Sequence, residues 1–134
     1  MKNTSKILLS NWVNVLGLVI TVYLFTFLMM FVISPEQDND RMSIWLGGTL
    51  ILIFGYGFIV WLGFLTAIIL LDIFLIVPSR IRLKEKLLLE WLIIILPFIY
   101  WAFEYDYWLW LMLATSFLIT QIIRKNKIES IIKT

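Results

Sequence analysis

The sequence predicts an all-α membrane protein with four transmembrane helices, on three observations. Of its 134 residues, 62% are hydrophobic and only 15% are charged, whereas soluble domains are about 45–50% apolar and about 25% charged. The apolar residues gather in long runs that favour spans over roughly 12–32, 44–77, 87–103 and 108–123. Most cations lie before the first run, between the second and third runs, and after the fourth run. We therefore expect one integral membrane domain over 1–134.

The first span, 12–32, follows a short polar N-terminus. Its apolar run is longer than the roughly 7–15 residues of a secretory signal and lacks an Ala-x-Ala-like cleavage site, which predicts an uncleaved helix. Gly17 and Thr21 lie four residues apart, a spacing that allows a close helix neighbour. The span ends before the acidic, hydrophilic segment 34–42, where Pro35 interrupts the helix.

The second run, 44–77, is unusually long and holds a single charged residue, Asp72. At about 1.5 Å per residue it exceeds the ~30 Å hydrocarbon core, yet neither half is long enough to span alone. We expect one span whose surplus length is taken up by tilt, by a kink near its glycines, or by an end in the interface. Small residues share one helix face and predict a packing stripe: Gly48, Gly55, Gly63 and Thr66. The alternative is that glycine is simply frequent in membrane helices.

The last two spans, 87–103 and 108–123, are separated by four residues, so we expect a tight antiparallel hairpin. Pro97 lies inside the third span and favours a bend. The tail 124–134 carries isoleucines at helical spacing, and one expectation is that it lies on the membrane surface.

Charge predicts the orientation. All of the 11 Lys and Arg residues except Arg41 lie in the N-terminus, the 78–86 loop or the tail. The positive-inside rule then places both termini and this loop in the cytoplasm, N-in/C-in. We expect contact with anionic lipid from Arg80, Arg82, Lys84, Lys86, Arg124, Lys125 and Lys127. Aromatic residues crowd the 104–107 turn, as interface anchors or, alternatively, as a surface for a partner or polysaccharide.

Two ionisable residues fall inside the predicted spans, Asp72 and Glu90. They either sit at headgroup depth, paired with Arg80, Arg82 or Lys84, or form a carboxylate pair in a proton or ion path. Asn11 and Asn14 lie at the same depth. We expect them to hydrogen-bond these carboxylates or to cap the first span.

The composition also excludes chemistries. The chain has no Cys and no His, which removes thiol and imidazole catalysis, thiolate metal sites and ordinary zinc or haem ligation. No phosphate-binding loop or nucleophile elbow is present, and nothing beyond the cations favours nucleic acid. We therefore expect no catalytic residue, metal site or cofactor, and no enzyme.

The lead hypothesis is a small non-enzymatic multi-pass protein that packs in the bilayer against another integral membrane protein or a second copy of itself. It would be an accessory or assembly subunit. A special case is an immunity protein against a pore-forming toxin. The alternative is a small oligomeric ion or proton permeation or transport protein that uses Asp72 and Glu90. Abundant Ile, Lys and Asn suggest a bacterium, and hence its cytoplasmic (inner) membrane.

Overall fold

The computed structural model describes residues 2–33, 40–79 and 81–133, and within these ranges the chain is helical with no strand. The acidic segment expected around Pro35, and Arg80 of the basic loop, lie outside the described residues. Six α-helices occur in the described ranges: α1 (Lys2–Leu9), α2 (Trp12–Phe27), α3 (Arg41–Ile51), α4 (Phe58–Leu71), α5 (Leu83–Glu104) and α6 (Leu109–Lys133). Three π-helical turns extend α2, α3 and α4: η1 (Leu28–Ile33), η2 (Leu52–Tyr56) and η3 (Asp72–Ile76).

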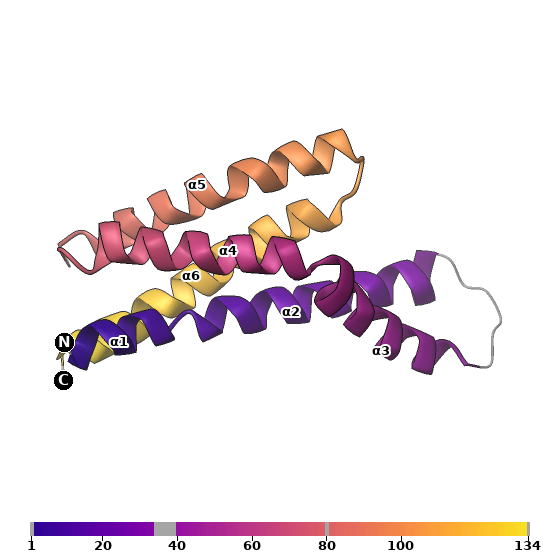
Figure 1. Ribbon diagram of the computed structural model, residues 1–134, viewed down its shortest axis with the longest axis horizontal. Helices are drawn as coiled ribbons and strands as arrows, with labels where there is room; N and C mark the ends of the chain where they lie inside the picture. The colour runs from indigo at the N-terminus through magenta and orange to yellow at the C-terminus, as the bar shows by residue number, and fades with distance from the viewer. Residues whose placement is uncertain (1, 34–39, 80, 134) are drawn as a thin grey trace.

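The helices form an elongated bundle (Figure 1). α1 and α2 run end to end along one side, α4 and α5 lie along the other, and α6 packs against both α2 and α5. The two ends of the chain lie together at one end of the bundle, as does the turn from α4 to α5. The turn from α5 to α6 lies at the opposite end. We call these the terminal end and the hairpin end.

Three helices are long and apolar enough to cross a membrane: Thr4–Ile33, Phe58–Ile76 and Leu83–Glu104. A shorter apolar helix covers Arg41–Tyr56. The helix α6 is not among the three, because Gln121 and the charged residues from Arg124 onward interrupt its apolar sequence.

The outer surface of the bundle is strongly apolar. Large side chains on several helices are largely exposed, including Ile59 at 81%, Phe74 at 72% and Phe103 at 75%. Soluble proteins rarely leave wide apolar patches facing water. A surface of this kind is suited to lipid hydrocarbon, in which an exposed apolar side chain has no cost.

The run 44–77, expected as one span, is two helices that meet at Gly57. The backbone N–H of Gly57 donates to the carbonyl of Leu52 at 2.8 Å, which closes the π-helical turn η2. A Cβ at this position would lie 2.8 Å from Leu52 O and 2.9 Å from Ile53 O, so only glycine allows the approach without a shift. The surplus length is therefore taken up by a bend at a glycine, and α3 diverges from the line of α4 (Figure 1).

Polar contacts fasten α3 to the far end of α2. The Trp45 indole N–H donates to Thr26 Oγ1 at 3.1 Å, and this hydroxyl lies 2.9 Å from Thr49 Oγ1. Arg41 donates to the Met30 carbonyl. These bonds give partners to the Trp45 N–H and the Thr49 hydroxyl in an apolar setting, where an unpaired polar group is costly.

The expected hairpin between the last two helices is present. The Tyr105 N–H donates to Trp101 O and the Tyr107 N–H to Ala102 O, each at 3.1 Å, so the last carbonyls of α5 find partners. Asp106 adopts a left-handed conformation with φ 48°, which Asp tolerates better than most residues.

A close helix crossing joins α2 to α6 at Gly17. Its carbonyl accepts hydrogen bonds from Thr21 Oγ1 at 2.9 Å and from Ser116 Oγ at 3.2 Å. A Cβ at Gly17 would lie 2.2 Å from Thr120 Cγ2. The small residue anticipated in the first span is therefore the one that permits this approach.

The C-terminal tail differs from the expectation that it lies on a membrane surface. α6 continues without a break to Lys133, and Ile128 is fully buried. It packs with Ile7 and Ile76, while Ile132 packs against the same group of side chains. The helical spacing of these isoleucines serves the bundle, because burying them against other helices gives them close-packed neighbours.

Candidate functional site

A polar turn begins the site. Ser10 and Asn11 separate α1 from α2, and Ser10 Oγ donates to the Ile7 carbonyl at 2.5 Å. Asn11 Nδ2 donates to Asp72 Oδ2 at 2.6 Å, and Asn14 Nδ2 donates to Asn11 Oδ1 at 3.0 Å. The two amides thus form a relay that runs from the first turn of α2 to the carboxylate at the start of η3.

Arg124 of α6 lies at the centre of the site. Its Nη2 is 2.5 Å from Asp72 Oδ2, and its Nη1 is 3.4 Å from each carboxylate oxygen of Glu90. Its Nε donates to Ser10 Oγ at 2.9 Å, and Nη1 also reaches Gln121 Oε1 at 3.5 Å. One guanidinium therefore joins the α1–α2 turn, η3, α5 and α6.

These side chains form a buried polar layer across the bundle. None of them exposes more than 5% of its surface. We define the polar layer as Ser10, Asn11, Asn14, Asp72, Glu90, Gln121 and Arg124. Apolar residues one helical turn away close it toward the terminal end, namely Ile7, Ile76, Leu87 and Ile128. Others close it toward the hairpin end, namely Leu18, Ile68, Ile94 and Phe117.

The energetics of the layer follow from its burial. Moving charges out of water costs several kcal/mol per ion, and close pairing offsets this cost only when both partners are present. Removing one partner of a buried pair typically costs about 3–5 kcal/mol. Arg124 and Asp72, both with fully buried side chains, are therefore required together. Such a layer sets the register of four chain segments, since a slip along any helix would strand a charge in apolar surroundings.

The structure brings the four intramembrane candidates together: Asp72, Glu90, Asn11 and Asn14. Two roles were expected for Asn11: a hydrogen bond to a carboxylate, or a cap on the first span. Its side chain donates to Asp72 and makes no capping hydrogen bond. The carboxylates pair with Arg124, whereas Arg82 and Lys84 are exposed on the terminal-end turn and on α5.

Arg124 corrects one sequence-based expectation. We expected it at the lipid headgroups with the rest of the basic tail, and it is instead fully buried. The signal was the helical spacing of α6, in which Phe117, Gln121, Arg124 and Ile128 share one face. Counting Arg124 with the tail cations concealed this spacing. Ser10 and Gln121 were missed because single polar residues near the ends of the predicted apolar runs do not stand out from the sequence.

The other predicted lipid-contacting cations that the structure describes belong to segments at the terminal end. Lys86 is used internally: its Nζ donates to Leu75 O of η3 at 2.7 Å and to Ser79 O, in the turn after η3, at 2.5 Å. Lys125 pairs with Glu129 at 3.3 Å. The remaining described cations of this set are Arg82, which lies 3.7 Å from Glu85, the exposed Lys84, and Lys127, which lies over the Trp12 ring at 4.4 Å.

The predicted glycine stripe points away from the bundle. Gly48, Gly55, Gly63 and Thr66 are all exposed. A Cβ added at Gly48 or Gly63 would meet no atom within 4 Å among the described residues, and one at Gly55 would meet only Ile51 of its own helix. The bend at Gly57 also separates the first two members from the last two, so the stripe does not follow one straight helix. It packs against nothing in the described part of this chain.

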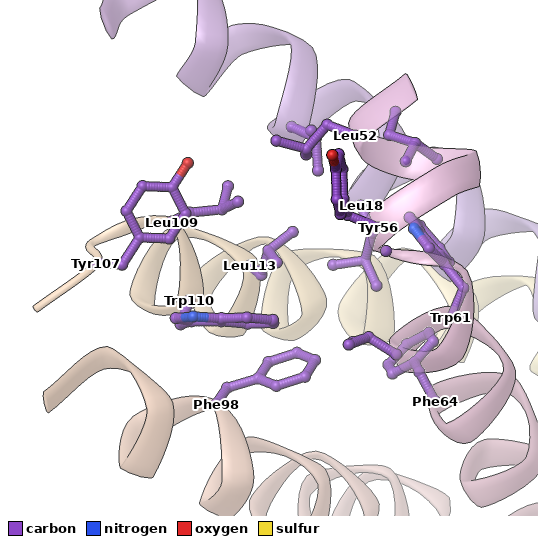
Figure 2. Close-up of a pocket in the computed structure, with 14 residues that line it drawn as sticks. Leu18, Leu52, Tyr56, Trp61, Phe64, Phe98, Tyr107, Leu109, Trp110 and Leu113 are labelled. Atoms are coloured by element: carbon purple, nitrogen blue, oxygen red, sulfur yellow. The ribbon is translucent and has the colours of Figure 1, made fainter. Parts of the chain in front are cut away.

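The hairpin end holds an apolar cavity of about 220 Å³ (Figure 2). Aromatic side chains supply much of its wall: Phe98 and Trp110 face one another with ring centroids 5.7 Å apart, and Phe64 lies across from them. Tyr107, between α5 and α6, brings one of its few polar groups, and burial raises the pKa of this phenol. The cavity is therefore suited to apolar matter rather than to a charged ligand.

No family model, no curated protein and no solved structure matches the chain. Within the described ranges no group of three or more acidic, Cys or His side chains is placed to hold a metal ion.

Proposed function

We propose that the chain is an integral protein of a bacterial inner membrane with four membrane-embedded crossings and both termini in the cytoplasm. Three crossings correspond to the helices that are long and apolar enough. The apolar part of α6, packed along α2 and α5, is the fourth. The cations support this orientation, because every Lys and Arg of the described ranges except Arg41 belongs to segments at the terminal end of the bundle (Figure 1).

Absence of cysteine makes the orientation directly testable. Single thiols placed at exposed positions, Ser5→Cys, Tyr105→Cys and Lys133→Cys, report on the two ends of the bundle. In intact spheroplasts a membrane-impermeant thiol reagent should label Tyr105→Cys alone, and opening the membrane should expose the other two. Labelling of Ser5→Cys or Lys133→Cys in intact spheroplasts would contradict four crossings with both termini inside.

We further propose that the protein is not an enzyme and acts by packing its helices against another integral membrane protein or a second copy. The observation that carries this proposal is that the groups able to do chemistry are bonded to one another inside a closed layer. What the bundle presents outward is apolar helix surface, including the small residues of α3 and α4. Small residues on a lipid-facing helix let a neighbouring backbone approach closely.

Crosslinking in native membranes tests this function. Thr66→Cys lies on the glycine-bearing face, and Leu92→Cys is an exposed control on α5. A thiol-attached photocrosslinker should give an adduct of defined mass at position 66 and not at position 92. Adding Gly63→Leu should remove that adduct, because a large side chain would fill the shallow surface. Absence of any adduct, or equal adducts at both positions, would count against packing through this face.

The alternative, a proton or ion permeation protein, is favoured by one observation: Asp72 and Glu90 are buried together beside a single guanidinium. If this function holds, the reconstituted protein should conduct protons or cations above the level of empty liposomes. Asp72→Asn and Glu90→Gln should then reduce the flux. If the wild type, Asp72→Asn and Glu90→Gln all gave the flux of empty liposomes, a permeation function would be refuted.

A further inference from the structure

The polar layer contains two carboxyl groups and only one cationic group among the described residues. Its charged groups are Asp72 of η3, Glu90 of α5 and Arg124 of α6, all fully buried. The α1–α2 turn and α2 contribute only neutral groups, Ser10, Asn11 and Asn14, and α6 adds the neutral Gln121. With both carboxyls ionised, the layer formed by the described residues would hold one unbalanced negative charge. In an apolar interior such a charge is costly enough that the group takes up a proton instead.

The two carboxyls are held unequally. Asp72 Oδ2 accepts hydrogen bonds from two side chains, Arg124 at 2.5 Å and Asn11 at 2.6 Å. Glu90 receives two longer contacts, each of 3.4 Å, from a single nitrogen of the same guanidinium. Arg124 therefore pairs more closely with Asp72 than with Glu90.

Hydrogen-bond pairing leads to the same residue. The Asn14→Asn11→Asp72 relay fixes both amide orientations, so Asn14 Oδ1 is an acceptor, and it has no partner among the described residues. Asp72 Oδ1 is a second acceptor without a hydrogen-bond partner. Within the described ranges one other buried side-chain polar atom has no partner, and it is a donor, Gln121 Nε2. A carboxylate at Glu90 adds acceptors alone. A carboxylic acid there adds one O–H donor and keeps one carbonyl acceptor.

We propose that Glu90 is a proton-binding site: in the folded protein it carries a bound proton, and the ionised pair in the layer is Arg124 with Asp72. The proton makes the layer electrically neutral and adds a second donor to a layer with two unpartnered acceptors and one unpartnered donor. Folding then takes up a proton from water, since an exposed glutamate is ionised at neutral pH. This inference does not depend on partner packing or on permeation, because a proton bound at Glu90 need not move.

Infrared spectroscopy of the full chain in nanodiscs at neutral pH tests the proposal. Glutamate labelled with ¹³C at its carboxyl should show one carboxylic-acid C=O band, with no such band from labelled aspartate. Glu90→Gln should abolish the band, and the exposed control Glu85→Gln should retain it. Absence of an acid band in the wild-type protein, or its persistence in Glu90→Gln, would overturn the proposal. Absence of the band from the wild-type spectrum would overturn the proposal even if a variant does not fold.

A second readout is the pH dependence of unfolding in detergent. Because folding takes up a proton at Glu90, the wild-type midpoint should fall as pH rises above the ordinary glutamate pKa of about 4.3 and through neutrality, and the midpoint of Glu90→Gln should fall less. Exchanging sodium for a large organic cation should leave both midpoints unchanged. A wild-type midpoint that required sodium would mean that a metal ion, and not a proton, balances the layer, and would refute the proposal.

Discussion

The two ends of the bundle are stabilised by different interactions: ion pairs and hydrogen bonds at one end, and aromatic packing at the other. Toward the terminal end, Arg124, Asp72 and Glu90 meet in a closed layer of directional contacts. Toward the hairpin end, rings such as Phe98, Phe64 and Trp110 pack without polar partners and leave a cavity of about 220 Å³. Lipid offers no hydrophobic drive to bring helices together, so association relies on packing and polar contacts. The polar layer therefore specifies the arrangement of the helices, and the aromatic end fills space around it.

The largest effect should come from removing the cation of the polar layer. Arg124→Ala leaves the buried Asp72 carboxylate without its partner, and we expect a loss of about 3–5 kcal/mol in the free energy of unfolding. Lys133→Ala, at the exposed end of the same helix, should change it by less than about 0.5 kcal/mol. Denaturant titration in mixed micelles measures both variants. Similar small changes in the two would mean that the layer is not what holds α6.

A smaller effect is expected between the two ends, where α2 crosses α6. Gly17→Ala would place a methyl group 2.2 Å from Thr120 Cγ2, so the helices must separate, at a cost of about 1–3 kcal/mol. Gly63→Ala meets no atom within 4 Å among the described residues and should cause no loss. The same unfolding titration compares the pair, and equal losses would show that the close crossing at Gly17 is not a tight contact.

The smallest effect belongs to the aromatic end. Val60 lines the cavity, and Val60→Ile adds one methylene to space that is open, for a gain of about 0.5–1 kcal/mol. Val32→Ile makes the same change on an exposed surface and should be neutral. Differential scanning calorimetry in detergent resolves the pair. A loss at position 60 would mean that the hairpin end is as tightly specified as the polar layer.

Much of this arrangement is predictable from the residue pattern. The helical class, the short turn around Asp106 and the common depth of Asp72, Glu90 and Asn11 all follow from hydropathy and spacing. Arg124 does not, because a cation at the start of a basic tail resembles its neighbours until the burial of α6 is known. The bend at Gly57 is not predictable from the sequence either. The run 44–77 contains five glycines, and Gly57 differs from the other four in that two backbone carbonyl oxygens approach it closely in the fold.

The glycine stripe shows the limit of reasoning from a helical wheel. A helical wheel assumes one straight helix. It therefore placed Gly48 and Gly63 on one face, although the two residues lie in different helices on either side of the bend. The small residue that contacts another helix is Gly17, in a span with a single glycine. Composition alone therefore does not identify the packing face.

A double-mutant cycle between Asp72 and Arg124 tests the central claim most directly. The free energy of unfolding is measured for the wild type, Asp72→Ala, Arg124→Ala and the double variant in one micelle system. If the buried pair fixes α6 against η3, the double variant should be more stable than the sum of the single losses predicts, by about 2 kcal/mol or more. Single losses that add to within about 0.5 kcal/mol would contradict the account.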